Sequence, residues 1–227
     1  MTGLQAPVDP GEVEARVAAV RARIAAAGGA GRVRLVAVTK GFGAEAVGAA
    51  LAAGVSDVGE NYAQELAAKA ADPVTAGARW SFVGRLQRNK VRLVAPVVSL
   101  WQSVDRESLA VEIGRRAPGS TVLVQVNVTD QPEKGGCRPG EVAGLVAAAG
   151  AEGLAVGGLM AVGPGGPPEA AREPFRALVA LADRLDLEER SIGMTDDLEV
   201  AVEEGSTMVR IGRALFGERP RLSLPGN

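Results

Sequence analysis

Short apolar runs alternate along the chain with stretches in which apolar residues recur every three or four positions. The run at 33–40, Val-Arg-Leu-Val-Ala-Val-Thr-Lys, is rich in β-branched residues, and Gly41 follows it at once. It is too short for a helix, so it predicts a buried strand that ends in a lysine. By the same criteria, further strands are predicted at 55–59, 80–84, 99–104, 121–128, 154–161, 189–194 and 207–211.

The first amphipathic stretch predicts a helix at about 10–27. Asp9 is a suitable cap, and Pro10 stands at the first helical position. Its apolar face consists of Val13, Val17, Val20 and Ile24. Helical patterns also follow the strands, at 44–53, 63–71, 89–94, 105–116, 139–150, from 168 onward, and at 198–204 and 212–216.

Eight strands that alternate with helices predict parallel pairing with right-handed crossovers. Eight such units in a chain of 227 residues favour a single (β/α)8 TIM barrel with an extra N-terminal helix. No long linker divides the chain, so we expect one domain over 1–227, with the barrel at about 33–219. A doubly wound open sheet is the alternative, and it requires two of the weaker predicted strands to be loops.

Composition excludes several functions. The net charge of -2 and the pI of about 5.4 do not support binding to nucleic acid or to an anionic membrane surface. Cys137 is the only cysteine and histidine is absent, so neither a disulfide framework nor a cysteine-based zinc site is expected. The chain has no apolar run of membrane-spanning length, and its first ten residues do not resemble a signal peptide. We therefore expect a cytoplasmic protein, and a monomer because the helices show no additional apolar face.

Lys40 ends the first predicted strand, at the edge where barrel enzymes place their sites. Desolvation disfavours the ammonium form and so lowers the pKa of an amine. A neutral amine attacks an aldehyde to form a Schiff base. The structural alternative is a lysine that only extends its ammonium group into solvent from a strand end.

The last two predicted strands lead into loops that suit a phosphate. Thr195 precedes a predicted helix that Asp196 and Glu199 are expected to cap, and Arg210 leads into Gly212 and Arg213 at the start of another helix. Such loops commonly bind phosphate in barrels. A Schiff-base lysine opposite a phosphate site suits pyridoxal 5′-phosphate, because the aldehyde and the phosphate of this cofactor lie on opposite sides of its ring. Arg210 would then donate to the pyridine nitrogen and keep it unprotonated, which makes the ring a poor electron sink.

Several other residues lie at strand ends on the same predicted rim. Asn61 follows the second strand and could equally be a helix cap, and Met160 ends the sixth strand. Tyr62, the only tyrosine, is expected to pack between sheet and helix. Weaker candidates, each of which is also an ordinary loop residue, are Gln87, Asn89, Lys90 and Asn127.

Ordered motifs over nearly all of 33–219 resemble the pyridoxal phosphate homeostasis protein family, single-domain relatives of the alanine racemase N-terminal barrel. The motifs that carry the resemblance are Val-Ala-Val-Thr-Lys at 36–40, Gly-Glu-Asn-Tyr-Ala-Gln-Glu at 59–65, Trp-Ser-Phe-Val-Gly-Arg-Leu-Gln-Arg-Asn-Lys at 80–90, Gln-Val-Asn at 125–127, Gly-Leu-Met at 158–160, Gly-Met-Thr-Asp-Asp at 193–197 and Gly-Ser-Thr-Met-Val-Arg-Ile-Gly at 205–212.

The resemblance implies roles for individual residues of the cofactor site. Lys40 would be the Schiff-base lysine, Arg210 would lie near the ring nitrogen, and Asn61 would lie beside the ring. Thr195 and the backbone of Gly212 and Arg213 would hold the phosphate.

Three positions depart from the family pattern. Ser81 and Arg85 stand where histidines are usual, which weakens any catalytic role of the third strand. Arg213 stands where threonine is common, and an added cation there could strengthen phosphate binding.

The function that we expect from these residues is to hold pyridoxal phosphate and release it within cellular vitamin B6 homeostasis, without catalytic turnover. A two-base racemase needs a proton donor on each face of its substrate, and alanine racemases take a tyrosine from a second domain that we do not expect here. Pyridoxal phosphate-dependent apoenzymes are candidate partners. A racemase-like enzyme dependent on pyridoxal phosphate is the alternative, and a Schiff-base aldolase is a third possibility.

Overall fold

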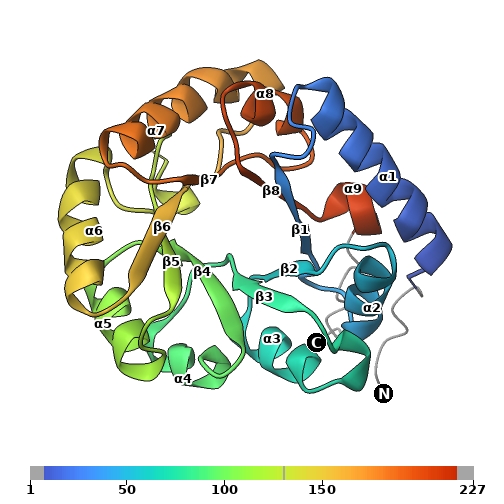
Figure 1. Ribbon diagram of the computed structural model, residues 1–227, viewed down its shortest axis with the longest axis horizontal. Helices are drawn as coiled ribbons and strands as arrows, with labels where there is room; N and C mark the ends of the chain where they lie inside the picture. Colours follow the sequence, from blue (N-terminus) through green and yellow to red (C-terminus); the bar gives the residue numbers. More distant parts are fainter. Residues whose placement is uncertain (1–7, 130, 219–227) are drawn as a thin grey trace, which may run out of the picture.

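The computed structural model describes residues 8–129 and 131–218, and within them eight parallel strands form a closed barrel (Figure 1). Each strand pairs with the next, and β8 pairs with β1. The strands are β1 Arg34–Val38, β2 Asp57–Glu60, β3 Arg79–Phe82, β4 Val98–Val104, β5 Thr121–Gln125, β6 Ala155–Met160, β7 Glu189–Ser191 and β8 Met208–Ile211. The predicted (β/α)8 barrel is confirmed, and the open-sheet alternative is wrong.

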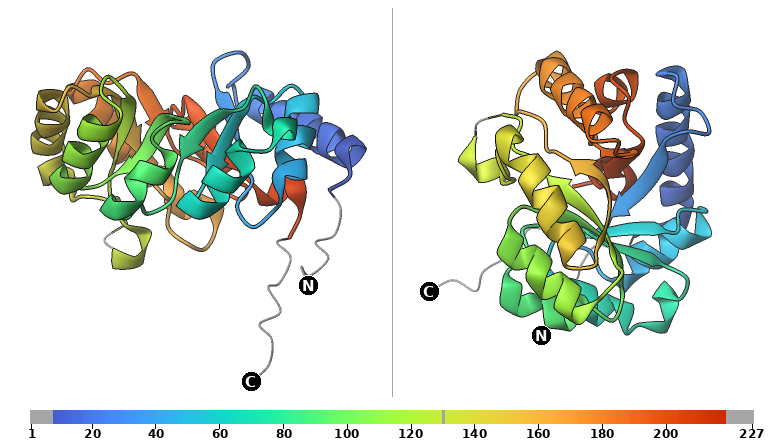
Figure 2. Two further views of the ribbon diagram at one scale, coloured as in Figure 1. Left: turned by 90° about the horizontal axis from the view of Figure 1, so that it is seen from below. Right: turned by 60° about the vertical axis from the view of Figure 1, so that its left-hand side comes forward.

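Helices surround the barrel, and α1 lies along the outer edge next to α8, α9 and α2 (Figures 1 and 2). The helices are α1 Pro10–Ala26, α2 Ala44–Ala52, α3 Ala63–Ala70, α4 Val91–Val94, α5 Glu107–Arg116, α6 Val142–Ala151, α7 Arg172–Arg184, α8 Leu198–Glu203 and α9 Arg213–Phe216. The additional N-terminal helix is thus confirmed, and it packs against α2, α8 and α9. The predicted domain limits at Met1 and Asn227 and the barrel end at Arg219 lie outside the described residues.

The N-terminal helix forms for the reasons that its sequence indicates. The Asp9 carboxylate accepts a hydrogen bond from the backbone N–H of Gly11 at 2.8 Å, which satisfies one of the first unpaired donors of the helix. The four predicted apolar residues from Val13 to Ile24 are all buried. In the described part of the chain, no helix has both the length and the apolar character needed to cross a membrane.

Side chains along each strand alternate between the helical layer and the barrel interior, as the pleat of a strand requires. On β8, Val209 and Ile211 belong to the core that the helices cover, whereas Met208 and Arg210 point inward. On β1, Leu35 and Ala37 likewise face the helices. Inward side chains near the carboxyl ends of the strands are therefore the ones that can form a site.

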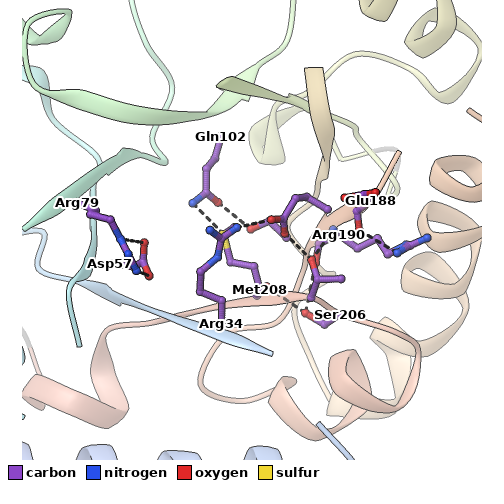
Figure 3. Close-up of polar contacts among 11 residues, drawn as sticks. Arg34, Asp57, Arg79, Gln102, Glu188, Arg190, Ser206 and Met208 are labelled. Atoms are coloured by element: carbon purple, nitrogen blue, oxygen red, sulfur yellow. Dashed lines mark hydrogen bonds and ion pairs between the residues drawn. The ribbon is translucent and has the colours of Figure 1, made fainter. Parts of the chain in front are cut away.

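Polar contacts link the strands at the opposite, N-terminal end of the barrel (Figure 3). Arg79 pairs with Asp57 across β3 and β2 at 2.6 Å, and Arg34 pairs with Glu189 from β7. All four residues stand at the starts of their strands. These contacts link neighbouring strands at the N-terminal end of the barrel. The active sites of such barrels lie at the other end, where the carboxyl ends of the strands meet.

Candidate cofactor site

A pocket of about 680 Å³ opens at the carboxyl ends of the strands. Six of the seven predicted binding residues line it: Lys40, Asn61, Thr195, Arg210, Gly212 and Arg213. These residues come from the ends of β1, β2, β7 and β8 and from the loops that follow them. A volume of this size suits a small-molecule cofactor.

Met160 is the predicted binding residue that the pocket does not include. Its side chain is 1% exposed, and it lies inside the barrel below the pocket. Val162, two residues further along the chain, lines the pocket instead. The two side chains share the inward face, but each pair of residues advances a strand by about 6.6 Å, so only Val162 reaches the upper edge. Met160 therefore lies on the predicted strand, deeper in the barrel than the residues that line the pocket, and its contact with a cofactor stays a prediction.

Lys40 occupies a tight turn immediately after β1. The backbone N–H of Phe42 donates to the carbonyl of Thr39 at 3.0 Å, which closes a four-residue turn with Lys40 at its second position. Gly41, at the third position, has φ of 79°, a conformation that favours glycine. Lys40 is half-buried and lines the pocket, so the turn directs it into the barrel mouth.

Arg210 is a buried cation, and its hydrogen bonds to Ser191 and Ala161 go to neutral groups. Its guanidinium donates to the Ser191 carbonyl at 2.6 Å, to the Ser191 hydroxyl at 2.7 Å and to the Ala161 carbonyl at 2.8 Å. Burial lowers the pKa of Arg210 to about 10, and the Asp197 carboxylate acts in the opposite direction. Arg210 therefore keeps its charge at neutral pH in a setting where charge is poorly solvated.

A chain of hydrogen bonds across the barrel interior orients the hydroxyl that Arg210 contacts. The Ser191 hydroxyl donates to the amide oxygen of Gln102 at 2.7 Å, and the Gln102 amide nitrogen contacts the Met208 sulfur at 3.1 Å (Figure 3). Because the Ser191 proton is committed to Gln102, its oxygen is left to accept from Arg210. Gln102 and Ser191 are fully buried.

The loops after β7 and β8 also line the pocket. The Thr195 hydroxyl accepts from the backbone N–H of Ala214 at 3.3 Å, which joins the two loops. At Gly212, an added Cβ would lie 3.0 Å from the Val38 carbonyl oxygen, so glycine allows this close approach of β1 and β8. Arg213 forms an exposed ion pair with Asp196. Hydroxyl, backbone and guanidinium donors at a helix start suit an anion.

The prediction that Asp196 caps the following helix is wrong. Asp197 is the cap residue of α8, and its carboxylate accepts from the backbone N–H of Met194 at 2.6 Å. Asp196 instead reaches Arg213 because the closed barrel brings the loops after β7 and β8 together. The hydrophobic pattern along the sequence locates the helix, but it does not show whether Asp196 or Asp197 occupies the cap position.

Several weaker sequence candidates lie outside the site. Tyr62 is 55% exposed, so the prediction that it packs between sheet and helix is wrong. Ser81 is buried below the pocket and Arg85 is exposed, and neither lines it. The other loop candidates that do not line it are Gln87, Asn89, Lys90 and Asn127.

Some pocket residues were not among the predicted site residues. Val83 lies one residue beyond β3, and Val162 lies two residues beyond β6. Phe42 lines the pocket and packs its ring against Phe216 with ring centroids 5.5 Å apart. Alternation of side chains along the predicted strand at 80–84, and along the predicted strand at 154–161 extended by one residue, would have identified the two valines.

A family model described as alanine racemase, N-terminal domain, matches residues 8–220. The chain is 41% identical over 219 residues to the pyridoxal phosphate homeostasis protein of Pseudomonas aeruginosa, a match that covers 89% of this chain and 94% of that protein. It is 39% identical over 212 residues to the protein of the same name from Deinococcus radiodurans, covering 90% and 99%.

Solved structures with the same fold include PipY of Synechococcus elongatus with PLP bound. It has a TM-score of 0.80 and 29% identity, and the match covers 90% of this chain and 100% of PipY. Alanine racemase from Corynebacterium glutamicum shares the fold, with a TM-score of 0.72 at 18% identity. That match covers 98% of this chain and 66% of the racemase.

Gly84 supports the pocket wall through a close backbone contact. A Cβ atom at this position would lie 2.3 Å from the carbonyl oxygen of Asn61, closer than non-bonded atoms approach. We expect Gly84→Ala to displace Asn61 and to lower the free energy of unfolding by about 1–3 kcal/mol, measured by denaturant titration. As a control, Gly144→Ala in α6 meets no atom within 4 Å and should raise that free energy by about 0.5–1 kcal/mol. Equal unfolding midpoints for Gly84→Ala and the unchanged protein would contradict the close contact.

Proposed function

The chain belongs to the pyridoxal phosphate homeostasis protein family, and we propose on that basis that it binds pyridoxal 5′-phosphate in the pocket described above and acts in intracellular vitamin B6 homeostasis. The observation that carries this proposal is that Lys40 and Arg210 line one cavity with the loops of Thr195 and Gly212. An amine, a guanidinium and an anion-binding loop are the groups that the aldehyde, the ring nitrogen and the phosphate of this cofactor require.

An unpaired polar atom in the pocket also supports the proposal that a ligand binds there. The amide oxygen of Asn61 is buried and has no hydrogen-bond partner among the described residues. An unpaired buried acceptor is costly, and a donor on a bound ligand would satisfy it. Lys40, Asn61, Thr195, Arg210, Gly212 and Arg213 are the residues that we propose hold the cofactor.

Lys40 would provide the covalent attachment. Its amine is the group that would bond to the aldehyde carbon of the cofactor, with loss of water. When bound, the cofactor would supply an electrophilic carbon and a ring that can accept electrons. Arg210 would limit the second property, because a guanidinium can donate to the ring nitrogen without transferring its proton.

We therefore propose that the protein holds and releases the cofactor and does not turn over amino acids. The names of the curated relatives support this reading, since they describe homeostasis proteins. We further propose that it works in the cytoplasm as a monomer and that apoenzymes that need the cofactor are its recipients.

Replacing Lys40 tests the attachment. Borohydride treatment of the wild-type protein with pyridoxal phosphate should add the reduced cofactor to the peptide that contains Lys40. Lys40→Ala should lose essentially all of this label, as judged by mass mapping of the digested protein. Lys90→Ala is the matched control, because Lys90 lies on a mouth loop but does not line the pocket, and it should label normally. A full label on Lys90 or Lys134 in the wild-type protein would refute the assignment.

Thr195→Ala tests the proposed phosphate loop. Loss of one hydroxyl contact should weaken pyridoxal phosphate binding by on the order of 1 kcal/mol, or about fivefold in dissociation constant. Equilibrium dialysis measures the change. Thr121→Ala, at the exposed N-terminal end of β5, should leave the constant unchanged. An unchanged constant in Thr195→Ala would remove this residue from the site.

The absence of turnover is tested with free amino acids. We expect no decarboxylation across a panel of amino acids incubated with the cofactor-loaded protein, because Arg210 disfavours electron withdrawal by the ring. We also expect no racemisation, because Tyr62, the only tyrosine of the chain, does not line the pocket. Chiral chromatography and carbon dioxide release are the measurements. Turnover of any member of the panel, lost in Lys40→Ala, would establish the racemase-like or lyase alternative.

A further inference from the structure

A cluster of buried charges lies directly behind the turn that carries Lys40. The Lys69 ammonium on α3 contacts the Glu60 carboxylate at the end of β2, and it lies 3.6 Å from the Glu65 carboxylate. The side chains of Lys69 and Glu60 are 6% and 0% exposed. We call these three residues the Glu60–Lys69–Glu65 cluster.

The cluster is on the outer face of the barrel wall, between the wall and α3. Along the end of β1, Ala37 faces the helices, Val38 lines the pocket, Thr39 turns back outward and Lys40 lines the pocket again. Glu60, the last residue of β2, and Asn61, the residue after it, alternate in the same way. Thr39 and Glu60 therefore stand behind the two adjacent pocket residues, and the Thr39 hydroxyl donates to the Glu60 carboxylate at 2.6 Å.

The cluster also binds both peptide groups that flank Lys40. The Lys69 ammonium donates to the Thr39 carbonyl at 2.8 Å, and the backbone N–H of Gly41 donates to the Glu65 carboxylate at 3.0 Å. The first contact holds the peptide bond before Lys40, and the second holds the peptide bond after it. Both bonds have an ionised partner, which makes them stronger than ordinary backbone hydrogen bonds.

Stability alone gives little reason for such a cluster. Two charges removed from water lose solvation that their attraction only partly restores, and apolar residues of similar volume are often at least as stable. Burial raises the pKa of Glu60, and the nearby Lys69 ammonium acts in the opposite direction. These charged groups form hydrogen bonds with the backbone on either side of Lys40, the proposed attachment residue.

We propose that Glu60, Lys69 and Glu65 are positioning residues that fix the backbone of Lys40, so that its amine points at the cofactor aldehyde before attachment. This inference rests on the proposed function, because it assigns the cluster to the Lys40 attachment step. Lys69 itself does not form the covalent link. Orientation of the two reacting groups is the effect, and a small displacement of a reacting group commonly costs a large factor in rate.

Glu65 offers the cleanest test because its side chain is 36% exposed and Lys69 keeps Glu60 as a partner without it. Glu65→Leu removes the acceptor for the Gly41 N–H and should slow covalent attachment of pyridoxal phosphate by about tenfold. Stopped-flow absorbance and borohydride trapping measure the rate of attachment. Glu65→Gln retains an amide oxygen that accepts from Gly41, and it should attach within about twofold of wild type.

The parallel measurement uses pyridoxine 5′-phosphate, which has an alcohol in place of the aldehyde. Its dissociation constant should be the same in wild type and both Glu65 variants, because binding without attachment does not need an oriented amine. If Glu65→Leu attaches pyridoxal phosphate as fast as wild type, or if the two ligands weaken in parallel, the positioning role is refuted. If wild type carries no label on Lys40, the proposed function fails instead, so the two failures are distinguishable.

Lys69 is tested with a compensated pair of variants. Lys69→Met leaves the Glu60 carboxylate buried without its cation and should destabilise the fold. Adding Glu60→Gln removes that charge and should restore the unfolding midpoint. The double variant should nevertheless attach pyridoxal phosphate about tenfold more slowly than wild type, because the Thr39 carbonyl has lost its ammonium partner. Recovery of both the midpoint and the attachment rate would show that the cluster is only structural.

Discussion

The pairing of β8 with β1 is the constraint on which the site depends. It closes the barrel and places Arg210 on β8 opposite Val36 on β1. Lys40 lies just beyond the end of β1. Because side chains alternate along each strand, this register turns the guanidinium and the amine toward one interior. Gly212 is part of the same constraint, since a side chain there would meet the Val38 carbonyl. Two residues from opposite ends of the chain become neighbours only through this closure.

The two cations of the site are held in physically different ways. Arg210 is fixed by hydrogen bonds to neutral groups: two carbonyls, and a serine hydroxyl that Gln102 orients. Its charge therefore remains available to whatever occupies the pocket. Lys40 is held through its backbone, with the ionised groups placed behind the wall at Glu60 and Lys69. That arrangement fixes the turn without placing a carboxylate from the cluster inside the pocket.

The positions that depart from the family pattern agree with a site built for binding. Ser81, where histidine is usual, is buried below the pocket, and Arg85 points into solvent. Neither lines the cavity, so the third strand adds no acid or base to it. Arg213, by contrast, lines the cavity near Thr195 and adds a positive side chain on the side where an anion would lie. These differences agree with the proposal that the pocket binds an anionic cofactor.

The sequence by itself determined the alternation of strands and helices, the lysine at the end of β1, and the polar loops after β7 and β8. These depend on local patterns: strand and helix periodicity, caps and short motifs. Only the tertiary structure decided that Val162 and not Met160 reaches the pocket and that Asp196 pairs with Arg213. It also showed the Glu60–Lys69–Glu65 cluster, for which Lys69 on the buried face of α3 with Ala63 and Leu66 was the one available signal. Depth along a barrel and pairing between loops follow from the register of neighbouring strands, and register is a property of the closed sheet that no single segment contains.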